Sequence, residues 1–178
     1  MQLLTTIYRH ENVNIAGKTF LREAVRGIIF RNTPPRTAAG APEKELLMIY
    51  SPVNGDYKFP GGGVKTGELH LDALQREIRE ESGATFKKVK GELGKVIEYD
   101  EAMEADFETF KMVSYYYFCE IDSEIGDLDL DDYEAELGFQ PVWVDIETAL
   151  ETNKRILTEA SSNPGWTRRE AFVLALLR

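Results

Sequence analysis

The segment from Gly62 to Ala84, GGVKTGELHLDALQREIREESGA, constrains the fold of this chain more than any other stretch. Its glycines let the backbone approach a ligand closely and adopt turns that other residues disfavour. The residues that follow, Leu69 to Ser82, carry Leu71, Leu74 and Ile78 at helical spacing, and Gly83 is a natural stop. The segment therefore predicts a glycine-rich loop, a helix anchored by one side in the core, and a sharp end to that helix.

The same helix carries three carboxylates on one face. Glu77, Glu80 and Glu81 stand at i, i+3 and i+4, roughly a quarter turn from the apolar stripe, and Ala73 on their side leaves room beside them. Carboxylates so close repel one another unless a positive charge compensates. Arg76 and Arg79 can supply part of that charge, and a hard divalent cation such as Mg²⁺ or Mn²⁺ can supply more. From these residues alone, a solvated acidic helix face stays open as the alternative.

The full spacing is more specific than the carboxylates. Gly62, Glu68, the run Arg76-Glu77-Ile78, the pair Glu80-Glu81, and finally Gly83-Ala84 fill every position of G-x5-E-x7-R-E-U-x-E-E-x-G-U, where U is a small or aliphatic apolar residue. A chance match is on the order of 10⁻⁷ per chain at average residue usage. This pattern resembles the signature box of the Nudix hydrolases.

The resemblance implies a fold and an activity. Nudix enzymes have an α/β/α sandwich around a mixed sheet, with the box forming a loop–helix–loop. They hydrolyse the P–O–P bridge of a nucleoside diphosphate linked to another group X, using Mg²⁺ or Mn²⁺ and water. A divalent cation would also explain how an acidic chain handles an anionic substrate. We therefore expect a pyrophosphohydrolase.

The resemblance also assigns roles by position. Glu77, Glu80 and Glu81 are expected to bind the metal, with Glu77 or Glu80 orienting or deprotonating the attacking water. Arg76 is expected to hold the helix carboxylates by salt bridges, and Glu68 to brace the loop. The loop itself is expected to be shaped by the backbones of Gly61, Gly62 and Gly63.

A carboxylate outside the box completes the site in many family members, often shortly before a strand that carries a tryptophan. Glu136 lies seven residues before Trp143, with Glu134 as its neighbour, and we predict Glu136 for this role. The alternative is that both belong to a solvated acidic loop, because residues 120–136 hold nine carboxylates and no Lys or Arg. This segment does not fit a calcium-binding EF-hand: Asp127, Asp129 and Asp131 alternate, but Tyr133 and not Gly follows Asp132.

Substrate contacts are expected from residues near the glycines. Arg26, Arg22 and Lys58 can reach phosphates, and Tyr57 can stack on a base. The alternatives are exposed charges and, for the aromatic residues, core packing. We expect His70 to be exposed, and the segment from Trp166 to Glu170 to serve packing and helix capping.

Strand-like runs and few helices predict a mixed α/β layered domain over residues 1–178. We expect strands at 20–30, 45–50, 57–59, 89–100, 109–121 and 139–144, with the 109–121 strand central because it is so aromatic. Helices are expected at 69–82, at 146–152 with Asp145 as N-cap, and from about Pro164 to the end with Phe172 and Leu176 inward. Residues 32–44 read as a protruding loop.

Composition excludes several classes of protein. A formal net charge of −10 argues against general nucleic-acid binding, which needs a basic surface. Neither a secretory signal nor a membrane span is expected from the sequence, and the single cysteine, Cys119, cannot form an internal disulfide. We expect a cytoplasmic protein that acts on a small nucleotide-type substrate, and homodimers are common in such enzymes.

Two other functional classes stay open. A catalytically silent nucleotide sensor on the same fold would usually lose box carboxylates, and this chain keeps all of them. A protein-interaction module would use the acidic segment and bind its partner without metal. For the enzyme, the group X is not specified by the box, and a nucleoside triphosphate is preferred on the ground that no extra domain is evident for a large X.

Overall fold

Strands form the frame of this protein, and helices lie against them. The computed structural model describes residues 1–33, 43–159 and 165–178. In chain order its elements are β1 (Leu3–Tyr8), β2 (Thr19–Thr33), β3 (Glu43–Ser51), β4 (Asp56–Lys58), α1 (His70–Ser82), β5 (Ala84–Glu101), β6 (Thr109–Ile125), α2 (Asp132–Glu136), β7 (Gln140–Asp145), α3 (Ile146–Glu159) and α4 (Thr167–Leu177).

The strands are ordered β1-β5-β6-β2-β3-β4, and β7 pairs with β3. β6 lies inside the sheet, antiparallel to β5 and parallel to β2, so its predicted central position is confirmed. β2 pairs with β3 only over its last residues, from Phe30 to Thr33. Earlier along β2, the Val25 N–H donates to the Gly62 carbonyl at 3.0 Å, so the glycine loop lies beside the strand there.

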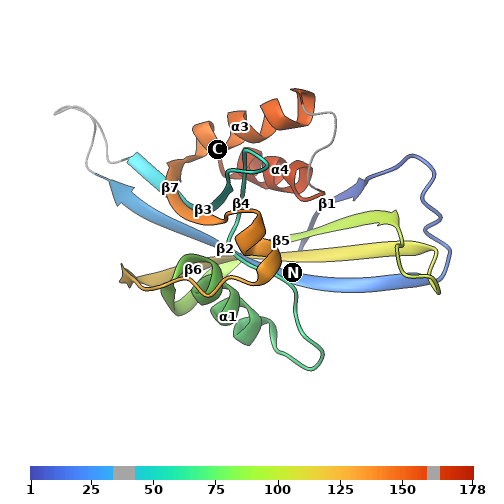
Figure 1. The fold of residues 1–178 in the computed structure, drawn as a ribbon, viewed down its shortest axis with the longest axis horizontal. Coiled ribbons are helices and arrows are strands. Elements are labelled where there is room, and N and C mark those ends of the chain that lie inside the picture. Colours follow the sequence, from blue (N-terminus) through green and yellow to red (C-terminus); the bar gives the residue numbers. More distant parts are fainter. Residues whose placement is uncertain (34–42, 160–164) are drawn as a thin grey trace.

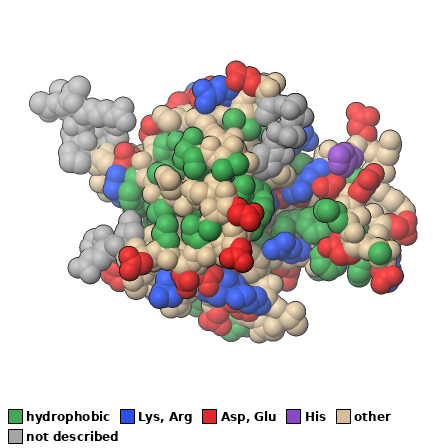
Figure 2. All heavy atoms as spheres, in the orientation of Figure 1, with side chains coloured by type: hydrophobic (Ala, Val, Ile, Leu, Met, Phe, Trp, Pro, Cys, Tyr) green, Lys and Arg blue, Asp and Glu red, His purple; other side chains and the backbone are tan. Residues whose placement is uncertain are grey.

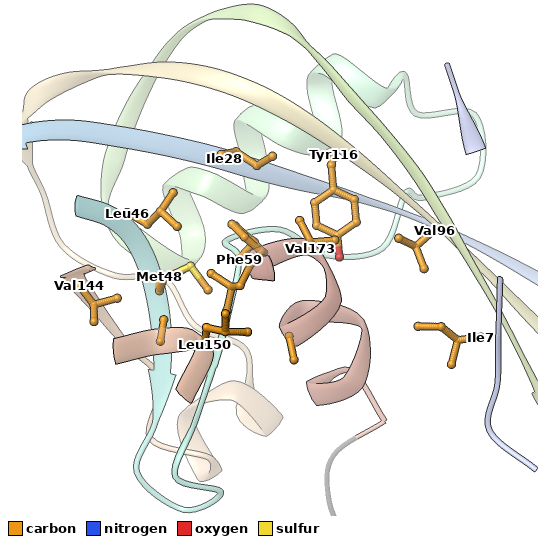
Figure 3. Packing of buried hydrophobic residues seen from close by; sticks show 13 residues of the cluster. Ile7, Ile28, Leu46, Met48, Phe59, Val96, Tyr116, Val144, Leu150 and Val173 are labelled. Carbon is orange, nitrogen blue, oxygen red and sulfur yellow. The ribbon is translucent and has the colours of Figure 1, made fainter. Parts of the chain in front are cut away.

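Helices cover both faces of the sheet, which confirms the predicted α/β/α arrangement around a mixed sheet. α1 lies on one face, and α3 and α4 lie together on the other (Figure 1). On the α4 side, Phe59, Tyr116 and Val173 pack among other buried apolar residues (Figure 3). On the α1 side, Leu74 and Ile78 pack against the sheet. One face of the sheet therefore holds α1, and the other holds α3 and α4. The candidate site described below lies beside the glycine loop, between α1 and the sheet.

The box helix forms as predicted and differs in one apolar residue. Leu74 and Ile78 are buried, as is Ala73, but Leu71 on the first turn is 50% exposed. The buried side of the helix begins only where it reaches the sheet, after Leu71. The helix ends at Gly83, whose φ is 68°, and a Cβ there would collide with the Gly126 carbonyl, so glycine is required.

Other expectations change in detail. β1 and the short α2 were not expected, and α3 runs seven residues beyond the expected end at 152. Asp145 does cap α3, accepting the Thr148 N–H at 2.8 Å. In α4, Leu176 is 50% exposed and Phe172 is half-buried, whereas Val173 and Leu174 are fully buried and anchor the helix. Most of the expected loop at 32–44, together with Pro164, lies outside the described residues.

Among the described residues, no helix is both long enough and apolar enough to span a membrane.

Candidate active site

Two of the three carboxylates that the box helix α1 presents on one face are buried between that helix and the glycine loop. Glu81 is fully buried and Glu77 is 7% exposed. Burying carboxylates is costly without hydrogen bonds and opposite charge. The Gly61 N–H donates to Glu81 Oε2 at 2.7 Å, and the Lys58 ammonium contacts Glu81 Oε1. The loop and β4 therefore hold the Glu81 carboxylate in place.

Glycine is required in this loop because the carboxylates approach its backbone. A Cβ at Gly62 would overlap the Glu77 carboxylate, and one at Gly61 would overlap the Val25 carbonyl. Gly61 also has a φ of 140°, which side-chain-bearing residues rarely adopt. The sequence GGG thus lets the loop lie between β2 and the box helix.

Arg76 joins the box carboxylates into one unit. Its guanidinium contacts Glu77 at 2.6 Å, Glu80 at 3.1 Å and Glu68 at 2.8 Å, and donates to the Gly63 carbonyl at 3.1 Å. Glu68 also accepts the Lys65 N–H at 2.8 Å, which closes the loop onto the helix. The hydrogen bond from Arg76 holds the pKa of Glu68 at about 2, well below its usual value.

Three carboxylates converge beside the glycine loop, two from α1 and one from α2. Glu77, Glu81 and Glu134 each offer an oxygen, and these oxygens lie within 4.8 Å of one another; we call them the acidic group. Burial raises the pKa of Glu81 to about 7, against the influence of Lys58, and burial with the nearby Glu81 raises the pKa of Glu77. The charged forms are therefore poorly compensated by the protein itself, and this all-oxygen donor set fits a hard divalent cation.

Glu136, the predicted extra carboxylate, is exposed and lies outside the acidic group, where Glu134 stands instead. The reason is the short helix α2. Asp131 caps it by accepting the Glu134 N–H at 2.8 Å, which fixes Glu134 on the first turn. Glu136, two residues later, points roughly 200° away around the helix axis.

Two other predicted site residues, Glu80 and Tyr57, also lie outside the acidic group. Glu80 lines the same cleft, paired with Arg76, but is not a member of the acidic group. Tyr57 packs on Tyr50 with ring centroids 5.0 Å apart and does not line the cleft. Because side chains alternate along a strand, it is the next residue, Lys58, that reaches Glu81.

The cleft that contains these groups has a volume of about 920 Å³. Figure 2 shows acidic side chains over α2, and basic ones in the hollow beside it. The cleft is also lined by Arg22 and Arg26 on β2, by Arg9 directly after β1, and by Arg169 on α4. The buried Arg26 donates to the Gly61 carbonyl.

A second buried charged cluster lies beside the cleft and was missed by sequence reasoning. We call it the α4 network: Arg9, Glu98, Arg169 and Glu170. Arg169 contacts Glu98 and pairs with Glu170 at 2.7 Å, and Arg9 pairs with Glu98 at 3.0 Å. The sequence predicts only packing and helix capping for the segment from Trp166 to Glu170. The signal for this cluster is the charged run Arg168-Arg169-Glu170 at the start of a helix.

His70 was expected to be exposed and is not. Its ring lies 4.4 Å from that of Tyr115, and its Nδ1 is hydrogen-bonded to the Tyr117 hydroxyl at 2.9 Å. It therefore packs the first turn of α1 onto β6.

Comparisons with known proteins agree with this geometry. A family model described as the NUDIX domain matches residues 24–163. RNA pyrophosphohydrolases from two strains of Helicobacter pylori are 31% identical over 86 residues, which cover 47% of this chain and 56% of each relative. The match thus spans little more than half the length of these curated relatives. A solved NUDIX hydrolase from Nitrosomonas europaea superposes with a TM-score of 0.51 at 15% identity, over 89% of this chain and 90% of that one.

Proposed function

Because this chain belongs to the Nudix family, we propose that it is a metal-dependent hydrolase that cleaves a P–O–P bridge in a nucleoside diphosphate linked to X. The acidic group is the observation that carries this proposal. Its carboxylates are buried or half-buried, come from α1 and α2, and meet at a glycine loop in a cleft otherwise rich in arginine. Perturbed pKa values in a cleft are typical of functional sites.

Glu77, Glu81 and Glu134 are the residues that would hold Mg²⁺ or Mn²⁺. A bound cation would supply positive charge to phosphate oxygens and lower the pKa of water. The chain's own contribution is positioning. Arg76 fixes the Glu77 carboxylate, and Lys58 with the Gly61 N–H fixes the Glu81 carboxylate.

Hydrolysis requires one proton to leave the attacking water. A bond forms between the water oxygen and one phosphorus atom, the bond from that phosphorus to the bridging oxygen breaks, and the proton passes to a base. We assign Glu80 to this role over Glu77, since Glu80 lines the cleft, lies outside the acidic group and keeps 30% of its side chain exposed. Arg76, 3.1 Å away, orients its carboxylate.

A nucleotide sensor without activity is the alternative. It is disfavoured because Glu77, Glu80, Glu81 and Arg76 are all present and interconnected. The Helicobacter relatives are named for RNA, and a 5′-triphosphorylated RNA end is therefore one candidate substrate. The net charge of −10 argues against a long nucleic-acid track.

The test is a substrate panel. The purified protein is incubated with nucleoside triphosphates, nucleotide sugars, ADP-ribose, dinucleoside polyphosphates and a 5′-triphosphorylated oligoribonucleotide, each with Mg²⁺, Mn²⁺ or EDTA. We expect turnover of at least one class with metal and none with EDTA. Hydrolysis that persists in EDTA, or in the Glu81→Gln protein at the wild-type rate, would refute the proposal.

A further inference from the structure

Aromatic side chains line part of the cleft that holds the acidic group. Tyr57, which the sequence predicts for stacking on a base, does not line it, whereas the half-buried Trp166 and the exposed Tyr133 do. Every nucleobase has a flat face, and an aromatic side chain in a binding cleft can stack on that face. The cleft therefore offers other rings in place of Tyr57.

Trp166, directly before α4, is a ring that the structure holds in place. Its Nε1 donates to Asp56 Oδ2 at 2.8 Å, and its ring packs edge-on against Phe139, with centroids 6.4 Å apart and planes at 85°. Tyr133, by contrast, is 56% exposed, and its side chain makes no hydrogen bond or ring contact with the described residues. A ring that is already fixed loses less conformational entropy when a ligand binds, so Trp166 is the better stacking surface.

The hydrogen bond between Trp166 and Asp56 is costly for a side chain that serves packing alone. Asp56, at the start of β4, is 1% exposed and forms no ion pair with the described residues. Its Oδ2 also accepts the Thr167 hydroxyl at 2.8 Å. Burying a carboxylate without a counter-ion costs free energy, and an apolar pair of side chains would fill the same space without that cost. What the carboxylate adds is a fixed orientation of the indole.

A short chain of contacts links Trp166 to the acidic group. The Lys58 ammonium, which contacts Glu81, lies 4.5 Å from the centre of the Phe139 ring. Trp166 packs on that same ring, which is 4% exposed. One ring and one ammonium group therefore separate the indole from the Glu81 carboxylate. In a bound nucleotide, the ribose between the phosphate and the base would span that interval.

We infer that the indole of Trp166 stacks on the base of the nucleoside while the phosphates lie at the acidic group, so that Trp166 favours a nucleotide over a diphosphate that carries no base. This inference rests on the proposed function, in which the acidic group and its metal receive the P–O–P bridge. Because its Nε1 is bonded to Asp56, Trp166 offers the base a face and no hydrogen-bond donor. It therefore recognises a flat ring and does not distinguish one base from another.

Indole fluorescence tests this inference on a variant that keeps Trp166. The chain has two tryptophans, and the other, Trp143 on β7, lies under Arg31 with its ring centre 4.5 Å from the guanidinium carbon and does not line the cleft. In Trp143→Phe the indole emission comes from Trp166 alone. Titration in Mg²⁺ with α,β-methylene-ADP, whose bridge is not cleaved, should quench this emission, because a stacked base quenches an indole. Methylenediphosphonate, which has the same bridge and no nucleoside, should leave it unchanged.

Calorimetric titration with the same two compounds measures the effect on affinity. In Trp166→Leu the affinity for α,β-methylene-ADP should fall roughly 5- to 150-fold, the usual range for the loss of one base–aromatic stack. The affinity for methylenediphosphonate should stay at the wild-type value. Trp166→Phe, which keeps a ring, should lose less, and Trp143→Phe is the matched control that should bind both compounds as the wild type does.

Two results would overturn the inference. One is the absence of quenching by α,β-methylene-ADP in Trp143→Phe, which decides the matter even where Trp166→Leu does not fold. The other is an equal loss of affinity for both compounds in Trp166→Leu, which would give the indole a role in folding alone. A silent substrate panel with the expected quenching would refute the hydrolase and leave the base site standing, whereas metal-dependent turnover without quenching would do the reverse.

Discussion

The acidic group and the α4 network both place charges in or beside one cleft, and they are balanced in opposite ways. In the α4 network each carboxylate meets a guanidinium: Arg169 lies between Glu98 and Glu170, and Arg9 pairs with Glu98. In the acidic group, Lys58 pairs with Glu81, and Glu77 shares Arg76 with two carboxylates outside the group. Glu134 has no ion pair among the described residues.

The pKa values follow the same division. Burial would raise the pKa of Glu98, but Arg169 and Arg9 together hold it below its usual value. Burial raises the pKa of Glu81 to about 7 despite Lys58. A balanced buried cluster is expected to act in stability and orientation, whereas an unbalanced one is expected to act by binding a cation. Burial alone therefore does not distinguish a structural cluster from a functional one. The charge that the cluster leaves uncompensated does.

The largest expected effect is on stability, when the balanced cluster loses its central cation. Arg169→Met leaves Glu98 and Glu170 buried without that guanidinium, so the free energy of unfolding should fall by about 3–5 kcal/mol. Urea denaturation followed by circular dichroism measures the change. Arg168→Met is the matched control: Arg168 is the exposed neighbour on α4, and its replacement should change stability by less than about 0.5 kcal/mol. Equal losses in the two variants would remove the distinction between buried and exposed arginines.

Loss of a carboxylate from the acidic group, the unbalanced cluster, should lower activity and leave stability nearly unchanged. Glu81→Gln should lower kcat/KM at least roughly 100-fold, because the proposed metal site loses a charged ligand. In EDTA its free energy of unfolding should stay within about 1 kcal/mol of wild type, since an amide is cheaper to bury than an uncompensated carboxylate. Steady-state kinetics and urea denaturation on the same preparation test both parts. A large destabilisation with normal turnover would give Glu81 the role assigned here to Glu98.

The membership of Glu134 can be separated from that of Glu136. Both lie on α2, and only Glu134 is in the acidic group. Glu134→Gln should lower kcat/KM roughly 10-fold or more and raise the Mg²⁺ concentration needed for half-maximal rate. Glu136→Gln, the matched variant on the same helix, should leave both quantities at wild-type values. The opposite pattern would restore the sequence-based choice of Glu136.

That choice shows what the sequence can and cannot supply. The box helix, its stop at Gly83 and the clustering of Arg76 with its carboxylates follow from local spacing, because a helix repeats every 3.6 residues. The position of Glu134 depends on a helix of five residues capped by Asp131, which the composition of the acidic segment conceals. A local pattern fixes which side chains share a face only once the element is known.

Long-range partners are the other part that sequence could not supply. Arg169 meets Glu98 from 71 positions away, and nothing in either local segment indicates the contact. For Tyr57 and Lys58, alternation along β4 predicts that one faces the site and the other does not, but which of them does so depends on how the strand lies against β3 and α1. These features arise from packing between distant elements.

Metal binding should stabilise the protein only through the unbalanced cluster. Saturating Mg²⁺, at roughly 100 times its dissociation constant, should raise the free energy of unfolding by about 2.7 kcal/mol in the wild type. The increase should be abolished or strongly reduced in Glu81→Gln and retained in Arg168→Met. Urea denaturation with Mg²⁺ and with EDTA gives the difference. A Mg²⁺ effect that survives Glu81→Gln would locate the responsible cation elsewhere.

The smallest effect concerns acid sensitivity and belongs to the balanced cluster. The folded state holds the pKa of Glu98 below its usual value, so ionised Glu98 stabilises the folded chain at neutral pH. This contribution is present above the unfolded pKa of about 4.3 and is lost as the pH falls from there through the folded value. Glu98→Gln should therefore flatten the decline in unfolding free energy below about pH 5, while lowering stability at pH 7 because Arg169 and Arg9 lose their shared carboxylate. Urea denaturation from pH 3.5 to 7 on wild type and Glu98→Gln measures both slopes. Identical slopes would mean that protonation of Glu98 does not cause the loss of stability at low pH. The two arginines would then stabilise the fold independently of the protonation state of Glu98.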